Sequence, residues 1–359
     1  KDLTIRNIMN LQIIPKELII IIRNYVIFMP ENEDVLKNAV HEWCIDNKLA
    51  KSKYGDISLW NTGKITNMKL LFAEYSKFND CINDWNVSNV TNMDFMFFYT
   101  SEFNQSLIDW NVSNVTSMRC MFYYAFDFNQ ELNKWNTKNV KDMSNIFSST
   151  LSFNKCINNW DVKNVTDMDS MFYNSFFFNC PLDKWDVSNV KNMKRMFSRT
   201  EAFNQNINNW DVSNVTNMNE MFLKAKSFNS PLNNWNLKNV SSIDQMFRFT
   251  KSFNQPLNKW SITNVRNLSW LFCGAIKFNQ SINNWDVSNV FDMTGLFYGA
   301  ESFNKPLDNW NVSNVIRICY MFKKAKSFNQ DLNCLNFENV VQKRNVFDET
   351  NIKTFPLWY

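Results

Sequence analysis

Hydrophobic and polar positions follow a pattern that repeats every 25 residues along most of the chain. Trp occupies one position of this pattern eleven times, from Trp60 to Trp310, and Leu335 takes the twelfth. Positions 25 residues apart form a column. Two columns hold 15 of the 17 Met residues and two others hold 23 of the 33 Phe residues, so the period does not slip. A fixed period of this length predicts a solenoid built from one repeated unit.

The repeat around Trp110 shows which elements we expect in each unit. Residues 110–113 alternate between apolar and polar side chains, which predicts a short strand with Trp110 and Val112 directed inward. The next apolar residues recur at i, i+3, i+4 and i+7, which predicts one face of a short helix. These residues are Met118, Met121, Phe122 and Ala125. Phe128 and Asn129 then turn the chain toward the next strand.

The predicted fold is an α/β repeat, a solenoid of twelve 25-residue coils that each contain a strand, a turn and a short helix. One coil cannot bury its own apolar face, so neighbouring coils must stack, with their strands paired in a parallel sheet. Two columns of asparagine, Asn79 to Asn329 and Asn89 to Asn339, are expected to form ladders. Their amides can donate and accept hydrogen bonds from coil to coil.

The ends of the chain do not follow the repeat. We expect residues 1–56 to form a helical N-terminal cap, residues 57–349 the solenoid and residues 350–359 a tail over the last coil. In the cap, Pro15 starts a predicted helix that includes residues 18–26, and residues 34–51 form a second. Leu36, Val40 and Trp43 lie on one face of the second helix.

Part of this N-terminal segment has an alternative interpretation. Residues 14–18, continued by Tyr25 and Val26, resemble the opening of an F-box, which would recruit a ubiquitin-ligase scaffold. The match is short and lacks the later F-box helices, so we favour the cap.

The repeat itself resembles a known family. Its consensus is Phe-Asn-Gln-x-Leu/Ile-x-x-Trp-Asp/Asn-Val-Ser-Asn-Val-Thr-x-Met-x-x-Met-Phe, clearest at residues 203–222. This consensus resembles the repeats of BspA-type leucine-rich repeat proteins over about residues 57–349. The resemblance implies a leucine-rich-repeat-like solenoid that binds proteins and has no shared catalytic residues. Members of that family occur on bacterial surfaces as adhesins and in large DNA viruses of protists.

Composition narrows the choice of function. The 38 basic and 34 acidic residues give a net charge of +4, too balanced to indicate nucleic acid. The single histidine, His41, has no partners for a catalytic set, and the eight cysteines have no metal-site spacing. We therefore expect no enzyme activity, cofactor or metal. Only five glycines occur, which argues against a fold built on many glycine turns.

The compartment is less constrained. We expect mostly free thiols and favour a reducing, cytoplasmic environment, with a virion or cell surface as the alternative. No secretory signal is visible, and the apolar run at residues 18–22 is too short to cross a bilayer.

Binding is expected through the columns that vary, at the outward helix positions and the following turn. In the second to fifth coils these columns are aromatic. Large exposed aromatic patches mark interaction sites, although some rings could instead pack under the cap or against one another. The candidate partner-binding residues are Phe95, Phe98, Tyr99, Tyr123, Tyr124, Phe126, Tyr173, Phe176 and Phe177.

Later coils carry basic residues in the same columns, interrupted by Glu201, Glu220, Asp244 and Glu301. These basic residues are Lys194, Arg195, Arg199, Lys224, Lys226, Arg248, Lys251, Lys323, Lys324 and Lys326. We interpret them as a solvated face and do not expect nucleic acid as a partner. Three function classes remain: a protein-binding scaffold, which we favour and which includes possible self-association, a virion or cell-surface structural protein, and a ubiquitin-ligase adaptor.

Overall fold

The computed structural model describes residues 27–359. The F-box-like segment and the helix expected over residues 18–26 lie outside the described residues. The ubiquitin-ligase adaptor function therefore stays a prediction from sequence.

The described chain begins with two short helices, α3 (Glu33–Ile45) and α4 (Asn47–Tyr54), followed by the 3-10 helix η1 (Ile57–Leu59). The single helix predicted over residues 34–51 is therefore wrong. Asp46 breaks it, because its backbone is extended and its carboxylate accepts the N–H groups of Lys48 and Leu49, which caps a new helix. The face predicted to be apolar is buried in α3, including Leu36 and Trp43.

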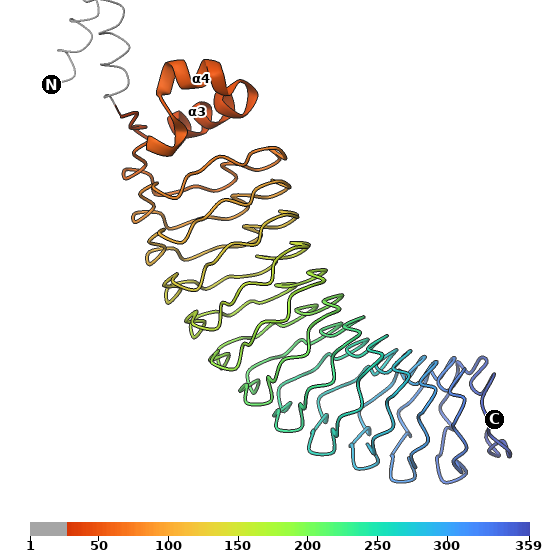
Figure 1. Ribbon diagram of the computed structural model, residues 1–359. Helices are drawn as coiled ribbons and strands as arrows, with labels where there is room; N and C mark the ends of the chain where they lie inside the picture. Colours follow the sequence, from red (N-terminus) through yellow and green to blue (C-terminus); the bar gives the residue numbers. More distant parts are fainter. Residues whose placement is uncertain (1–26) are drawn as a thin grey trace, which may run out of the picture.

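The remaining residues form a stack of similar coils that curves into an arc (Figure 1). Helices α3 and α4 lie at one end of the stack and the C-terminus lies at the other. Between them a single hydrophobic core runs through every coil. The prediction of a solenoid with a 25-residue coil is confirmed.

The helix predicted in each coil is wrong, and no α-helix occurs in residues 60–359. In the third coil the Met118 N–H donates to the carbonyl of Asp142 in the next coil at 3.1 Å, and Cys120 N–H donates to Ser144 at 2.9 Å. Met121 N–H instead bonds back to Met118 O within the coil. Alternate backbone N–H groups therefore donate to carbonyls of the next coil. In an α-helix, all of them would donate along the helix axis to carbonyls of the same segment.

Left-handed turns explain why the sequence pattern looked helical. Cys120 and Tyr124 have positive φ angles of 54° and 61°, as required at the third position of a type II turn. Consecutive turns of this kind direct positions i, i+3, i+4 and i+7 toward the core, and these are the positions that a helix would direct inward. Met118, Met121, Phe122 and Ala125 are all fully buried. The fold is not built on many glycine turns, as the scarcity of glycine predicted, because most of these left-handed positions hold other residues.

The predicted strand at residues 110–113 is a turn as well. Ser113 N–H donates to the Asn111 side chain at 3.2 Å, and Val115 N–H donates to Val112 O at 2.9 Å. Trp110 and Val112 still point inward and are buried. Parallel pairing is reduced to isolated bridges further along the coil, such as Asn92 to Ser117, so no extended parallel sheet forms.

Aromatic rings stack from coil to coil through the core. The rings of Trp110 and Trp135 lie 6.4 Å apart with planes 4° from parallel. Phe122 packs on Phe128 of its own coil at 4.0 Å and on Phe147 of the next at 5.7 Å. Since each ring has its partners in neighbouring coils, burial depends on the stack and not on the single coil.

The two asparagine columns make different contacts. Asn214 donates through Nδ2 to the Ser188 carbonyl of the preceding coil at 2.7 Å. Asn204 instead accepts, through Oδ1, the N–H of Asn229 in the following coil at 2.8 Å. One column therefore supplies donors to backbone carbonyls and the other supplies acceptors to backbone N–H groups.

The last described residues pack on the end of the core. Trp358 donates through Nε1 to Leu332 O at 3.0 Å, and its ring contacts Phe337 at a centroid distance of 4.5 Å. Tyr359 lies against Phe347 at 5.0 Å. These contacts cover apolar rings that have no further coil to pack on among the described residues.

Candidate interaction surface

Two of the variable columns coincide with the left-handed positions of the turns. Phe95, Tyr99 and Tyr124 all have positive φ, between 55° and 61°. In an L-residue this conformation brings Cβ close to the following carbonyl, at a cost of roughly 1–2 kcal/mol. Large aromatic residues therefore stand where glycine or asparagine would be the less strained choice.

Six of the nine predicted residues form one continuous cluster on the second and third coils. Tyr99 stacks on Tyr124 at 4.3 Å, and Tyr124 stacks on Tyr123 at the same distance. Phe98 contacts Tyr99 at 4.7 Å. The remaining rings extend this cluster at both ends. The N-terminal aromatic cluster thus comprises Phe95, Phe98, Tyr99, Tyr123, Tyr124 and Phe126.

These rings partly cover one another. Tyr99 is 41% exposed, whereas the other five are half-buried. Burial, with hydrogen bonding to Tyr124, raises the pKa of Tyr123, and burial also raises the pKa of Tyr99. The hydroxyls of Tyr99 and Tyr123 therefore stay neutral near pH 7, and the cluster offers a mixed surface of ring edges and phenol groups.

The other three predicted residues lie apart from this cluster. Tyr173, Phe176 and Phe177 belong to the fifth coil, and the fourth coil between them carries Ser148 and Ser149. Phe177 is 65% exposed, the most exposed ring of the nine. Tyr173 lies under the Arg199 guanidinium at 5.9 Å. The structure therefore divides the predicted surface into two parts.

A second aromatic cluster lies in the later coils, and sequence reasoning missed it. The Arg248 guanidinium lies between the rings of Phe249 and Trp270, 5.2 and 5.4 Å from their centroids. Trp270 also contacts Tyr298 and Tyr320. One signal was present in the sequence, because Trp270 stands outside the Trp column.

Five of the ten basic residues named in the later coils have acidic partners. Arg195 pairs with Glu220 at 2.8 Å, and Lys326 pairs with Glu301 at 2.9 Å. Exposed pairs of this kind contribute little stability. They do neutralise part of the basic face, in line with its interpretation as solvated.

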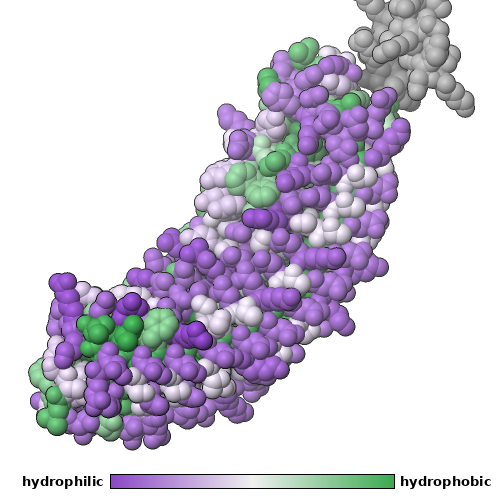
Figure 2. Space-filling view, turned by 180° about the vertical axis from the view of Figure 1, so that it is seen from behind, coloured by the Kyte–Doolittle hydropathy of each residue, from purple (hydrophilic) through white to green (hydrophobic). Residues whose placement is uncertain are grey.

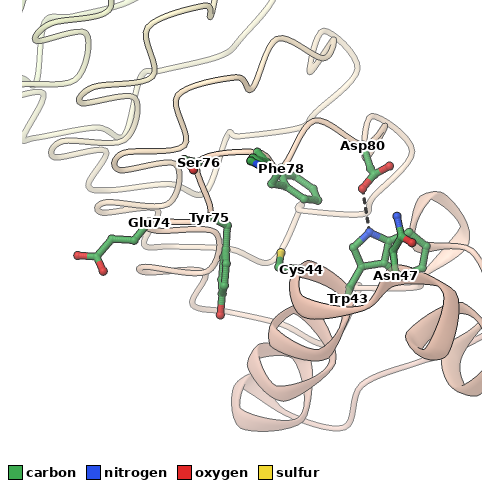
Figure 3. Close-up of a pocket in the computed structure, with 9 residues that line it drawn as sticks. Trp43, Cys44, Asn47, Glu74, Tyr75, Ser76, Phe78 and Asp80 are labelled. Carbon is green, nitrogen blue, oxygen red and sulfur yellow. Dashed lines mark hydrogen bonds between the residues drawn. The ribbon is translucent and has the colours of Figure 1, made fainter.

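A hollow of about 390 Å³ lies where α3 meets the first coils (Figure 3). On its wall the Trp43 indole donates to Asp80 at 2.8 Å. His41, which is exposed, shares a 2.7 Å hydrogen bond with the Tyr75 hydroxyl. Burial raises the pKa of the Cys44 thiol to about 12, so it is not a ready nucleophile. These contacts hold α3 against the coils.

Residues 27–359 contain no cluster of three or more metal-ligating side chains. None of their helices has the length and apolar character needed to cross a membrane.

One family model, described as "Mycoplasma protein of unknown function, DUF285", matches three times in tandem, at residues 42–158, 141–260 and 243–355. The chain belongs to the DUF285 family. The matches overlap slightly and together span nearly all of the described DUF285 chain. No curated protein is significantly similar to it.

Solved structures similar to this DUF285 protein are leucine-rich repeat proteins. One is a leucine-rich repeat protein from Eubacterium ventriosum, with 15% identity, a TM-score of 0.47 and coverage of 84% of each chain. Another is a leucine rich cell surface protein from Faecalibacterium prausnitzii, with 12% identity and a TM-score of 0.41. That match covers 79% of this chain and 77% of the other.

Proposed function

We propose that this protein is a non-enzymatic scaffold that binds another protein through the N-terminal aromatic cluster, with Phe177 as an outlying contact. The observation that carries the proposal is the continuous cluster of large, partly exposed rings on the second and third coils. The same column holds Asn174 and Gly299 in other coils, so packing of the coil does not require a ring at Tyr99 or Tyr124. Aromatic residues of this kind dominate the binding energy of protein interfaces.

The chemistry of the cluster suits protein recognition. Tyrosine and phenylalanine bring large contact areas with few rotatable bonds, and phenol groups can pair with polar groups of a partner. Neighbouring coils hold the rings in fixed positions, so little side-chain entropy is lost on binding. The coils that carry these rings belong to one curved stack (Figure 1).

The proposal can be tested by removing three rings. Tyr124→Ser, Phe126→Ser and Phe177→Ser together should abolish capture of specific partners from a lysate, measured by quantitative mass spectrometry against the wild type. A control with Phe291→Ser, Tyr298→Ser and Tyr320→Ser removes three rings from later coils and should retain capture. If the first variant unfolds, its rings are structural. If it folds and captures the same proteins, recognition lies elsewhere.

A second candidate is a structural role at a surface, through self-association, in line with the resemblance to BspA-type proteins. The column that holds threonine at residues 91, 116, 166 and 216 becomes apolar in the last coils. Phe291 is 37% exposed and Val341 is 77% exposed, with Ile316 between them. Figure 2 shows a compact hydrophobic patch near the C-terminal end of a mostly hydrophilic face. Ile316→Thr with Val341→Thr should then reduce association in sedimentation velocity.

A further inference from the structure

A groove in the middle of the solenoid shares Phe249 with the second aromatic cluster but is lined mainly by charged side chains. It has a volume of about 420 Å³ and crosses the fifth to eighth coils. The phenyl rings of Phe176 and Phe249 stand at opposite corners. Its walls are formed by the charged residues Arg199, Glu201, Lys224, Lys226 and Lys251.

The positive charge in this groove is largely uncompensated. The only carboxylate on its walls, that of Glu201, is bound to Lys226 at 2.6 Å. Arg199, Lys224 and Lys251 have no ion pair among residues 27–359. Further along the same two columns, Lys324 and Lys326 are paired with Glu349 and Glu301. Unpaired cations are therefore a local property of the groove and not of the columns.

Two of the three unpaired cations also lie over aromatic rings. The Arg199 guanidinium lies over the Tyr173 ring at 5.9 Å, and the Lys224 ammonium lies over the Phe249 ring at 6.0 Å. Cation–π contacts of this kind orient a charge without neutralising it. An incoming anion would thus meet positioned cations between two apolar corners.

We propose that this groove binds an extended acidic segment of a protein partner, with carboxylates on the cations and an apolar side chain against Phe176 or Phe249. This inference rests on the proposed protein-binding function and names the chemistry of the partner. The two rings lie three coils apart, roughly 15 Å at the spacing of parallel strands. An extended peptide covers that distance with four to five residues at about 3.3 Å each.

Single-stranded nucleic acid fits the groove less well. Binding of that kind stacks successive bases on a run of aromatic side chains. Here the rings occupy only the two corners, and the coils between them present Arg199, Glu201, Lys224 and Lys226.

The test measures fluorescence anisotropy of a labelled Glu-Phe-Glu-Phe-Glu-Glu peptide with the full chain. The wild type should bind it, more weakly as salt rises. The variant Arg199→Gln, Lys224→Gln, Lys251→Gln should lose roughly tenfold or more in affinity. The matched control Lys323→Gln, Lys324→Gln, Lys326→Gln removes the same charge from paired positions and should stay within about twofold.

Three results would overturn the proposal: equal binding of the peptide with Gln in place of Glu, equal losses in both variants, or tighter binding of a thymidine oligonucleotide of the same length. The variant Tyr124→Ser with Phe126→Ser should bind the peptide normally. If the peptide does not bind while capture through the N-terminal aromatic cluster persists, the groove proposal fails and the scaffold proposal stands.

Discussion

The indole Nε1 of Trp210 donates a hydrogen bond to the carbonyl oxygen of Leu182, 28 residues earlier, at 3.0 Å. Trp235 makes the same bond to Ile207, also at 3.0 Å. The Trp column therefore has two roles. Its rings fill the core, and its N–H groups satisfy buried carbonyls of the coil before.

Substitution of Trp210 should separate these two roles. Trp210→Ala should lower the free energy of unfolding by about 3–5 kcal/mol, as for other core aromatics. Trp210→Phe keeps a ring but leaves the Leu182 carbonyl unpaired, and should cost about 1–3 kcal/mol. Urea denaturation followed by circular dichroism measures both. An unchanged midpoint for Trp210→Ala would show that this indole does not support the stack.

The asparagine columns should respond differently to a loss of donors. In Asn214→Asp a carboxylate faces the Ser188 carbonyl across an exposed hydrogen bond, so we expect a loss of roughly 0.5–1.5 kcal/mol at pH 7. Asn204→Asp keeps the acceptor used by Asn229 and should cost less. Below the pKa of the new carboxyl, its O–H can donate to the Ser188 carbonyl. The loss of stability in Asn214→Asp should therefore become smaller as pH falls. Similar costs for both variants at pH 7 would contradict the assignment of donor and acceptor columns.

Two glycines in left-handed turns form a matched pair. A Cβ on Gly299 meets nothing nearer than 3.8 Å, so Gly299→Ala should cost only the backbone strain, about 1 kcal/mol. A Cβ on Gly295 would lie 2.2 Å from Cε3 of Trp270, so Gly295→Ala should cost roughly 1–3 kcal/mol more. Adding Trp270→Ala should remove that excess. Equal destabilisation by the two alanines would place the Trp270 ring elsewhere.

The thiols should differ sharply in reactivity. Cys81 and Cys334 are exposed, whereas Cys120 and Cys273 are buried. Burial raises the pKa of both buried thiols to about 11, which leaves very little thiolate at pH 8. Time-resolved alkylation with mass spectrometry should therefore label Cys81 and Cys334 first, and Cys120 and Cys273 only on unfolding. Rapid labelling of Cys273, or native disulfides at several of the eight cysteines, would contradict the stack.

The same thiols predict a loss of stability at alkaline pH. Their folded pKa of about 11 lies above the ordinary value of 9.0, so the folded state retains protons that the unfolded state releases. Their stabilising contribution is complete below pH 9 and falls as pH rises toward 11. Thermal melting should show a shallower decline over this range for Cys120→Ala with Cys273→Ala than for the wild type. Parallel curves would rule out a contribution from these groups.

Much of the architecture was contained in the sequence. The 25-residue period predicted the length of each coil, and the apolar columns predicted the core. Both follow because a solenoid needs similar side chains at the same position of every coil. Met118, Met121 and Phe122 were assigned inward correctly, since burial depends on which way a residue points. Part of the candidate site could also be predicted. The six rings on the second and third coils could be grouped because residues in the same column of adjacent coils must lie side by side.

The backbone between these columns was decided only by tertiary structure. A helix and a pair of type II turns bury the same positions, so periodicity cannot distinguish them. The choice depends on where the N–H groups go, and those of Met118 and Cys120 find carbonyls in the next coil. Left-handed backbone at Tyr124 is strained locally and exists because neighbouring coils hold it.

Charge pairing was likewise decided by the fold. Arg199 and Lys324 occupy equivalent positions in the repeat, yet only Lys324 has a carboxylate within reach, from Glu349 in the next coil. Whether a cation is neutralised depends on side chains 25 residues away and on the rotamers that bring them together. The sequence by itself determined the coil, the core and the columns that face outward. The stacking of coils determined which residues of those columns form aromatic clusters, ion pairs and a groove.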